Sequence, residues 1–128
     1  MHGAAILTLL TAVLQIWAAA QVARARARFG VKAPSTTGDP GFERVFRAQM
    51  NTIENTLVFL PVLWLASFYG VPVLYLAAGA VWIVARVWYV LAYSEAADKR
   101  SAGFTISMAA LGVLLVDSGL GIARSILG

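Results

Sequence analysis

The segment from Asn55 to Ala85 reads N-T-L-V-F-L-P-V-L-W-L-A-S-F-Y-G-V-P-V-L-Y-L-A-A-G-A-V-W-I-V-A and contains no charged side chain. A helix needs about 20 apolar residues to cross the hydrocarbon core of a bilayer, so this segment is too long for one span. It is interrupted by Gly70-Val71-Pro72, a combination typical of a turn. The segment therefore predicts the end of one membrane-spanning helix, a tight turn and the start of the next helix.

Two further stretches of the chain have the same apolar character. Residues 3–23 carry no charge, and residues 101–123 contain only Asp117. The chain of 128 residues is 60% hydrophobic and 12% charged, whereas a soluble domain is about 45–50% apolar and about 25% charged. We therefore expect an all-α fold, an integral membrane four-helix bundle formed by a single domain over residues 1–128. The predicted helices cover about residues 3–29, 41–69, 72–97 and 101–127.

The distribution of Lys and Arg predicts how the chain crosses the membrane. The first apolar stretch lacks a basic segment before it and exceeds the roughly 7–15 residues of a signal-peptide core, so we expect a retained span. Cations gather around the first and third loops, at Arg24, Arg26, Arg28, Lys32, Arg44, Arg47, Lys99 and Arg100. By the positive-inside rule these loops face the cytoplasm and both termini face away. In a bacterium the membrane would be the inner, cytoplasmic membrane.

The residue types that are scarce exclude several kinds of chemistry. The chain has no cysteine, which excludes disulfide scaffolds, thiolate metal sites and cysteine nucleophiles. Its one histidine is His2, so we expect no metal site. The net charge of +4 comes from cations at the ends of the spans, and we therefore expect a membrane partner rather than nucleic acid.

Three polar residues interrupt the second predicted span. Arg47, Asn51 and Glu54 are spaced i, i+4 and i+7, which places them on one face of a helix. Ionisable groups inside a membrane are costly and usually functional, so this stripe is expected to face protein or a water-filled cavity. The structural alternative is an ion pair of Glu54 with Arg47 or Arg86 that locks the bundle.

The third predicted span carries a second polar stripe near the same membrane face. Arg86, Tyr89 and Tyr93 share one side of the helix, and Arg100 joins them if the helix continues that far. Arginine binds carboxylates through paired hydrogen bonds, and tyrosine hydroxyls donate to carboxylates or thiolates. Facing each other, the two stripes predict a cationic pocket for a small molecule that has carboxylates and an ammonium group.

Asp117 is the one charged residue of the last apolar stretch. It lies toward the membrane face opposite to the two polar stripes. We expect it to have a structural role, either in a pair with Arg124, seven residues later, or at a contact between subunits.

Three sequence motifs resemble one known family. These are T-T-G-D-P-G-F-E-R at Thr36–Arg44, F-E-R-V-F-R-A-Q-M-N-T-I-E at Phe42–Glu54 and A-R-V-W-Y-V-L-A-Y at Ala85–Tyr93. They resemble the MAPEG family, the membrane-associated proteins in eicosanoid and glutathione metabolism. The resemblance covers nearly the whole chain and is strongest to the branch of microsomal glutathione transferases and leukotriene C synthase.

This resemblance implies a homotrimer with sites between neighbouring subunits near the cytosolic face. Each site would bind glutathione as co-substrate and join its thiolate to lipophilic electrophiles from the bilayer, with possible reduction of lipid hydroperoxides by the same thiolate. By motif position Arg100 is the catalytic residue that stabilises the thiolate. The glutathione-binding residues would be Arg26, Arg47, Gln49, Asn51 and Glu54, with Tyr89 and Tyr93 supplied by the neighbouring chain.

Two departures from the pattern of that branch affect the expected reaction. Asn55 stands where the branch has a tyrosine, and Ala27 stands where it has a second arginine. They favour a general, detoxifying glutathione transferase over leukotriene synthesis. The alternatives are a non-catalytic lipid-binding scaffold of the lipoxygenase-activating type, and a small exporter, which would need a carboxylate where the first span has only Gln15.

Overall fold

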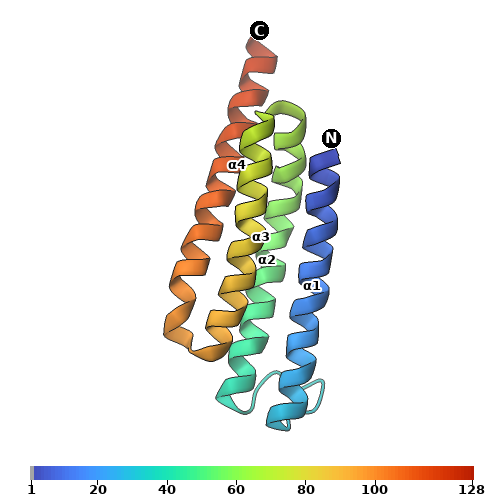
Figure 1. Cartoon of the computed structure of the whole chain (residues 1–128), viewed down its shortest axis with the longest axis vertical. Coiled ribbons are helices and arrows are strands. Elements are labelled where there is room, and N and C mark those ends of the chain that lie inside the picture. The colour runs from blue at the N-terminus through green and yellow to red at the C-terminus, as the bar shows by residue number, and fades with distance from the viewer. Residues whose placement is uncertain (1) are drawn as a thin grey trace.

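The computed structural model describes residues 2–128, which form four long helices that lie side by side (Figure 1). Each of the four is long and apolar enough to cross a membrane, which confirms the all-α four-helix prediction. The third helix ends two residues earlier than expected, and a single turn of 3-10 helix lies between it and the fourth helix. The helices are α1 (His2–Phe29), α2 (Pro40–Tyr69), α3 (Pro72–Glu95), η1 (Ala97–Arg100) and α4 (Ser101–Leu127).

The helices α2 and α3 form the middle of the bundle. The helix α1 packs against them on one side and α4 packs against them on the other (Figure 1). At the centre the rings of Phe59 and Trp82 stack with their centroids 3.8 Å apart, and Leu63 and Leu114 are fully buried beside them. This apolar centre sets the rotation of α2, α3 and α4 about their axes, and so determines which polar side chains meet.

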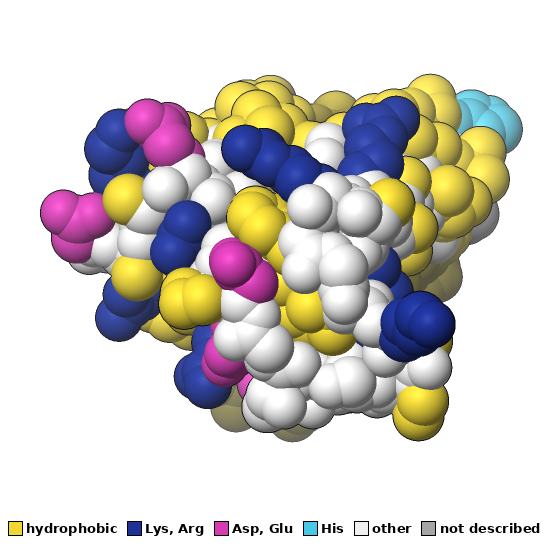
Figure 2. Space-filling model, turned by 90° about the horizontal axis from the view of Figure 1, so that it is seen from below, with side chains coloured by type: hydrophobic (Ala, Val, Ile, Leu, Met, Phe, Trp, Pro, Cys, Tyr) yellow, Lys and Arg dark blue, Asp and Glu magenta, His cyan; other side chains and the backbone are white. Residues whose placement is uncertain are grey.

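Large apolar side chains cover the outside of the bundle. Ile16, Leu57 and Val84 are each about 70% exposed, and they belong to three different helices. Exposed apolar surface of this extent is typical of a protein that contacts lipid or further copies of itself. Seen from the end that carries the first loop and the turn between α3 and α4, the bundle presents a collection of Lys and Arg side chains with several carboxylates (Figure 2).

The predicted turn between the second and third spans is present and is closed by Asp117. The helix α2 ends at Tyr69, and Pro72 begins α3. The buried carboxylate of Asp117 accepts the backbone N–H of Val71 through both oxygens, at 3.1 and 3.0 Å. Asp117 is therefore structural, as expected, but its partner is a helix N-terminus. The expected pair with Arg124 does not form among residues 2–128.

Replacing Asp117 with alanine is expected to lower the free energy of unfolding by about 1–2 kcal/mol, the typical value of a lost helix cap. Asp117→Asn keeps one acceptor oxygen and should lose less. Thermal unfolding of the purified protein in detergent measures both effects. Equal melting temperatures for the alanine variant and the unchanged protein would contradict this role.

Candidate functional site

A buried guanidinium joins three helices near the end of the bundle that carries η1. Arg86 of α3 has no exposed surface. Its Nη2 donates to Asn51 Oδ1 at 2.7 Å and to Thr52 Oγ1 at 2.9 Å on α2, and its Nη1 donates to Ser107 Oγ at 3.2 Å on α4. Hydrogen bonds to a charged donor are stronger than neutral ones. Arg86 therefore holds α2, α3 and α4 in one register.

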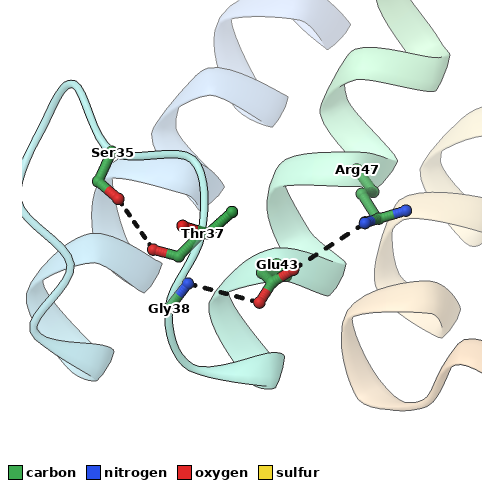
Figure 3. Close-up of polar contacts among 5 residues, drawn as sticks. All are labelled: Ser35, Thr37, Gly38, Glu43 and Arg47. Atoms are coloured by element: carbon green, nitrogen blue, oxygen red, sulfur yellow. Dashed lines mark hydrogen bonds and ion pairs between the residues drawn. The ribbon is translucent and has the colours of Figure 1, made fainter.

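The two ion pairs considered from the sequence are both absent from residues 2–128. Glu54 is exposed and has no cationic partner there. Arg47 lies one turn from Glu43, with its guanidinium 4.0 Å from a carboxylate oxygen, and Glu43 also accepts the N–H of Gly38 at 3.4 Å (Figure 3). Arg86 binds neutral groups instead of a carboxylate. The carboxylate of Glu54 thus faces outward from the single chain.

An open groove of about 400 Å³ brings together several residues of the predicted site. The guanidinium of Arg100 lies beside it, 5.4 Å from the centre of the Tyr93 ring and bonded to the carbonyl of Ala97 at 2.6 Å. Arg100 is exposed, so it can turn toward a ligand without disturbing the core. The groove is lined by Asn51, Tyr89, Arg100, Ser101, Phe104 and Thr105.

Three groove residues were not identified from the sequence. Ser101, Phe104 and Thr105 lie on the first turns of α4. Their spacing of i, i+3 and i+4, directly after Arg100, places them on one helix face. That pattern is the sequence signal that could have indicated them.

Tyr89 lines this groove together with Asn51 of the same chain. Its ring lies 4.1 Å from the guanidinium carbon of Arg86 and meets the ring of Tyr93 edge-on, with centroids 5.6 Å apart. The ring of Phe104 is 6.2 Å away. Of the two tyrosines, Tyr89 lines the groove, whereas Tyr93 contacts Tyr89 and Arg100 without lining it.

Two of the predicted residues lie on the other flank of α2. Gln49 precedes Asn51 by two residues, so it is about 160° away around the helix axis. It shares the face of Thr56, which accepts a hydrogen bond from Gln15 of α1 at 2.7 Å. Arg26 of α1 is committed to the first loop, where it donates to the Ser35 carbonyl at 2.8 Å. Within one chain, neither Gln49 nor Arg26 is among the residues lining the groove.

The geometry defines a class of protein: a multi-pass membrane protein with a cationic, tyrosine-walled groove at one end of its helix bundle. The comparisons with known proteins agree with this class. The model of the MAPEG family matches residues 4–120, and the chain belongs to this family.

The chain is similar to several members of the family over most of its length. It is 43% identical to human microsomal glutathione S-transferase 2 over 123 residues, which cover 96% of this chain and 84% of that protein. An uncharacterised protein of Synechocystis is 42% identical over 118 residues, which cover 92% of this chain and 86% of the relative. Leukotriene C4 synthase of Bos taurus is 38% identical over 118 residues, which cover 92% and 79%.

Proposed function

We propose that this protein is a membrane-embedded glutathione transferase that joins the thiolate of glutathione to lipophilic electrophiles dissolved in the bilayer. The observation that carries the proposal is the groove in which Asn51, Tyr89 and Arg100 lie together. The names of two relatives, a glutathione S-transferase and a leukotriene C4 synthase, support the same class of reaction.

Arg100 is the proposed catalytic residue because it supplies a permanent positive charge next to the groove. A free thiol has a pKa near 8.5, so only about 3% of it is thiolate at pH 7. The thiolate is the nucleophile. A neighbouring guanidinium favours the anion, and arginine does not compete for the proton because it stays charged. The thiolate then forms the new carbon–sulfur bond, and the leaving group departs with the electron pair of the bond that breaks.

Arg47 and Glu54 are the proposed ligands for the charged ends of the tripeptide. Both are exposed in the single chain, and they lie one turn on either side of Asn51. Glu54 would accept from the ammonium group, while Arg47 would donate to a carboxylate. The carboxylate of Glu54 has no competing cation within residues 2–128, which leaves it free for this role.

Arg26 and Gln49 fit this proposal if a neighbouring subunit supplies them. Arg26 is on α1 and Gln49 is on the side of α2 that faces α1, so both lie away from the groove of their own chain. A homotrimer would bring this side of the bundle to the groove of the next subunit, and the exposed apolar side chains of α1, such as Ile16, would then be covered. Tyr89 and Tyr93 would serve the groove of their own chain.

The groove is proposed to face the cytoplasm. The Lys and Arg side chains gather at this end of the bundle (Figure 2), and such side chains favour the cytoplasmic side of a membrane. The same thiolate would reduce lipid hydroperoxides to alcohols, with a second glutathione completing the disulfide product and water leaving. In a bacterium the enzyme would lie in the inner membrane.

The test is calorimetric titration of glutathione into the detergent-solubilised protein at pH 7, with thiolate absorbance recorded on the same sample. We expect binding together with a thiolate signal well above that of free glutathione. Binding without the signal would contradict the transferase proposal. No glutathione binding, with binding of lipid retained, would indicate the scaffold alternative.

Replacing Glu54 with glutamine is expected to weaken glutathione binding about tenfold, equivalent to about 1.4 kcal/mol, because the ammonium group loses its charged acceptor. The matched control is Glu95→Gln, which neutralises another exposed carboxylate near this end of the bundle, one that is paired with Lys99. The same titration measures both variants. Equal affinities for the two variants would remove Glu54 from the site.

A further inference from the structure

The side-chain amide of Asn51 has its orientation determined by its neighbours. Its oxygen accepts a hydrogen bond from Arg86 Nη2 at 2.7 Å and a longer one from Asn55 Nδ2 at 3.4 Å. A guanidinium has donors and no acceptor, so only the oxygen of the Asn51 amide can face it. The NH₂ group of Asn51 must therefore point away from Arg86. Because Asn51 lines the groove, this group is available to a ligand as a donor.

Arg86 also donates to two hydroxyl groups, those of Thr52 on α2 and Ser107 on α4. The hydroxyl of Thr52 donates to the carbonyl of Ala48 at 2.9 Å, and the hydroxyl of Ser107 donates to the carbonyl of Phe104 at 2.8 Å. Both hydroxyls have committed their hydrogens, so toward Arg86 they can act only as acceptors. The guanidinium thus has defined partners on α2 and α4 and cannot exchange roles with them.

The buried positive charge of Arg86 favours an anionic ligand in the groove, in addition to the NH₂ group that Asn51 presents there. Arg86 has no exposed surface and no carboxylate partner within residues 2–128. Tyr89, whose ring covers the guanidinium at 4.1 Å, also lines the groove. A buried charge without an ion-pair partner acts over a longer distance than one in water. It favours a negative group in the adjacent groove.

We propose that Arg86, which is not among the residues lining the groove, is a positioning residue that presents Asn51 as a hydrogen-bond donor and thereby makes the groove selective for an anionic group of the ligand. This inference rests on the proposed function, in which the anionic group belongs to glutathione. It assigns a role in ligand selection to a residue that would otherwise be interpreted as a lock between helices.

Two variants of Asn51, compared with the unchanged protein, separate positioning from simple structural support. Asn51→Asp keeps an oxygen for Arg86 and adds an ion pair, so the melting temperature should equal or exceed that of the unchanged protein. The same variant presents a negative oxygen to the groove in place of the NH₂ group, and we expect glutathione affinity to fall at least 30-fold. Asn51→Leu loses the contact with Arg86 and should melt earlier, yet lose only about tenfold in affinity.

The unchanged protein, Asn51→Asp and Asn51→Leu are ranked by glutathione affinity and by melting temperature, and the two rankings decide between positioning and structural support. Positioning predicts that glutathione affinity is highest in the unchanged protein, lower in Asn51→Leu and lowest in Asn51→Asp. The melting temperature should instead be lowest in Asn51→Leu. A merely structural contact predicts that affinity follows stability, with Asn51→Asp close to the unchanged protein and Asn51→Leu the weakest binder. Calorimetric titration and thermal unfolding of each variant in detergent measure the two orders, and the second pattern would overturn the proposal.

Variants of Arg86 test the donor of the hydrogen bond between Arg86 and Asn51. Arg86→Lys retains a charged donor for the Asn51 oxygen, and we expect its glutathione affinity to stay within about fivefold of the unchanged protein. Arg86→Met leaves Asn51 free to rotate, and we expect a loss of more than tenfold in affinity. Equal affinities for Arg86→Lys and Arg86→Met would overturn the proposal. If Arg86→Met does not fold, the comparison of the two Asn51 variants decides alone.

The titration of the unchanged protein keeps the two proposals apart. If glutathione binds and the Asn51 order is that of a structural contact, the transferase proposal stands and the role of Arg86 falls. If glutathione does not bind to the unchanged protein, both fall together.

Discussion

Replacing Arg100 with alanine is expected to remove nearly all of the thiolate signal of bound glutathione at pH 7. If Arg100 lowers the pKa of the bound thiol by about two units, the thiolate fraction is about three-quarters in the unchanged protein and about 3% in the variant. The difference is about 25-fold. The variant should fold normally, because Arg100 is exposed and its one hydrogen bond to the protein goes to a backbone carbonyl within its own turn.

The rate of conjugation should fall less than the thiolate signal. A more basic thiolate is a better nucleophile, which offsets part of the lost anion. We therefore expect the single-turnover rate with an aryl halide at pH 7 to fall about three- to tenfold. The loss should shrink as the pH rises above about 8.5, where the thiol of the variant ionises without help.

The control for this experiment is Lys99→Ala. Lys99 is the neighbouring exposed cation, and it is paired with Glu95 instead of lying at the groove. Its removal should leave the thiolate signal and the rate unchanged. A wild-type thiolate signal in Arg100→Ala would show that another group stabilises the anion.

Replacing Gly103 with alanine is expected to lower the free energy of unfolding by about 1–3 kcal/mol, the range for forcing extra atoms into a packed contact. A Cβ atom at Gly103 would lie 2.8 Å from the backbone nitrogen of Tyr89 and 3.0 Å from the carbonyl of Ala85. These are backbone atoms, so α3 and α4 would have to separate. That movement displaces the groove residues of α4 from Tyr89, and glutathione affinity should fall as well.

The matched control is Gly112→Ala on the same helix. Among residues 2–128, apart from the adjoining backbone of α4 itself, no atom lies within 4 Å of a Cβ added there. Alanine is preferred over glycine in a helix by roughly 0.5–1 kcal/mol. Gly112→Ala should therefore be neutral or stabilising. Thermal unfolding in detergent compares the two variants, and equal melting temperatures would contradict the close packing of α3 on α4 at Gly103.

Much of the fold could be predicted from local properties of the chain. Apolar length determines which segments can cross a membrane, and the break at Gly70-Val71-Pro72 follows from the backbone preferences of glycine and proline. The end of α3 was predicted two residues late. The helix ends because the backbone is extended at Ala96, before the η1 turn, and this stretch has no glycine or proline that would indicate the break.

The candidate site was predicted less completely, because residues were identified by motif while their partners depend on packing. Asn51, Tyr89 and Arg100 were named, and the structure brings them to one groove. The ion pairs considered for Glu54 and for Asp117 do not form among residues 2–128. In both cases charge and spacing along one helix suggested an ion pair, whereas the structure leaves Glu54 outward and turns Asp117 to the start of α3.

The sequence by itself determined that this chain forms four membrane-length helices with polar residues concentrated near one end, because helix formation and membrane insertion depend on each segment's own composition. Only the tertiary structure decided that Arg86 binds Asn51, Thr52 and Ser107 without a carboxylate. Contacts between helices depend on the rotation and depth of each helix, and these are set by the packing of the apolar centre around Phe59 and Trp82.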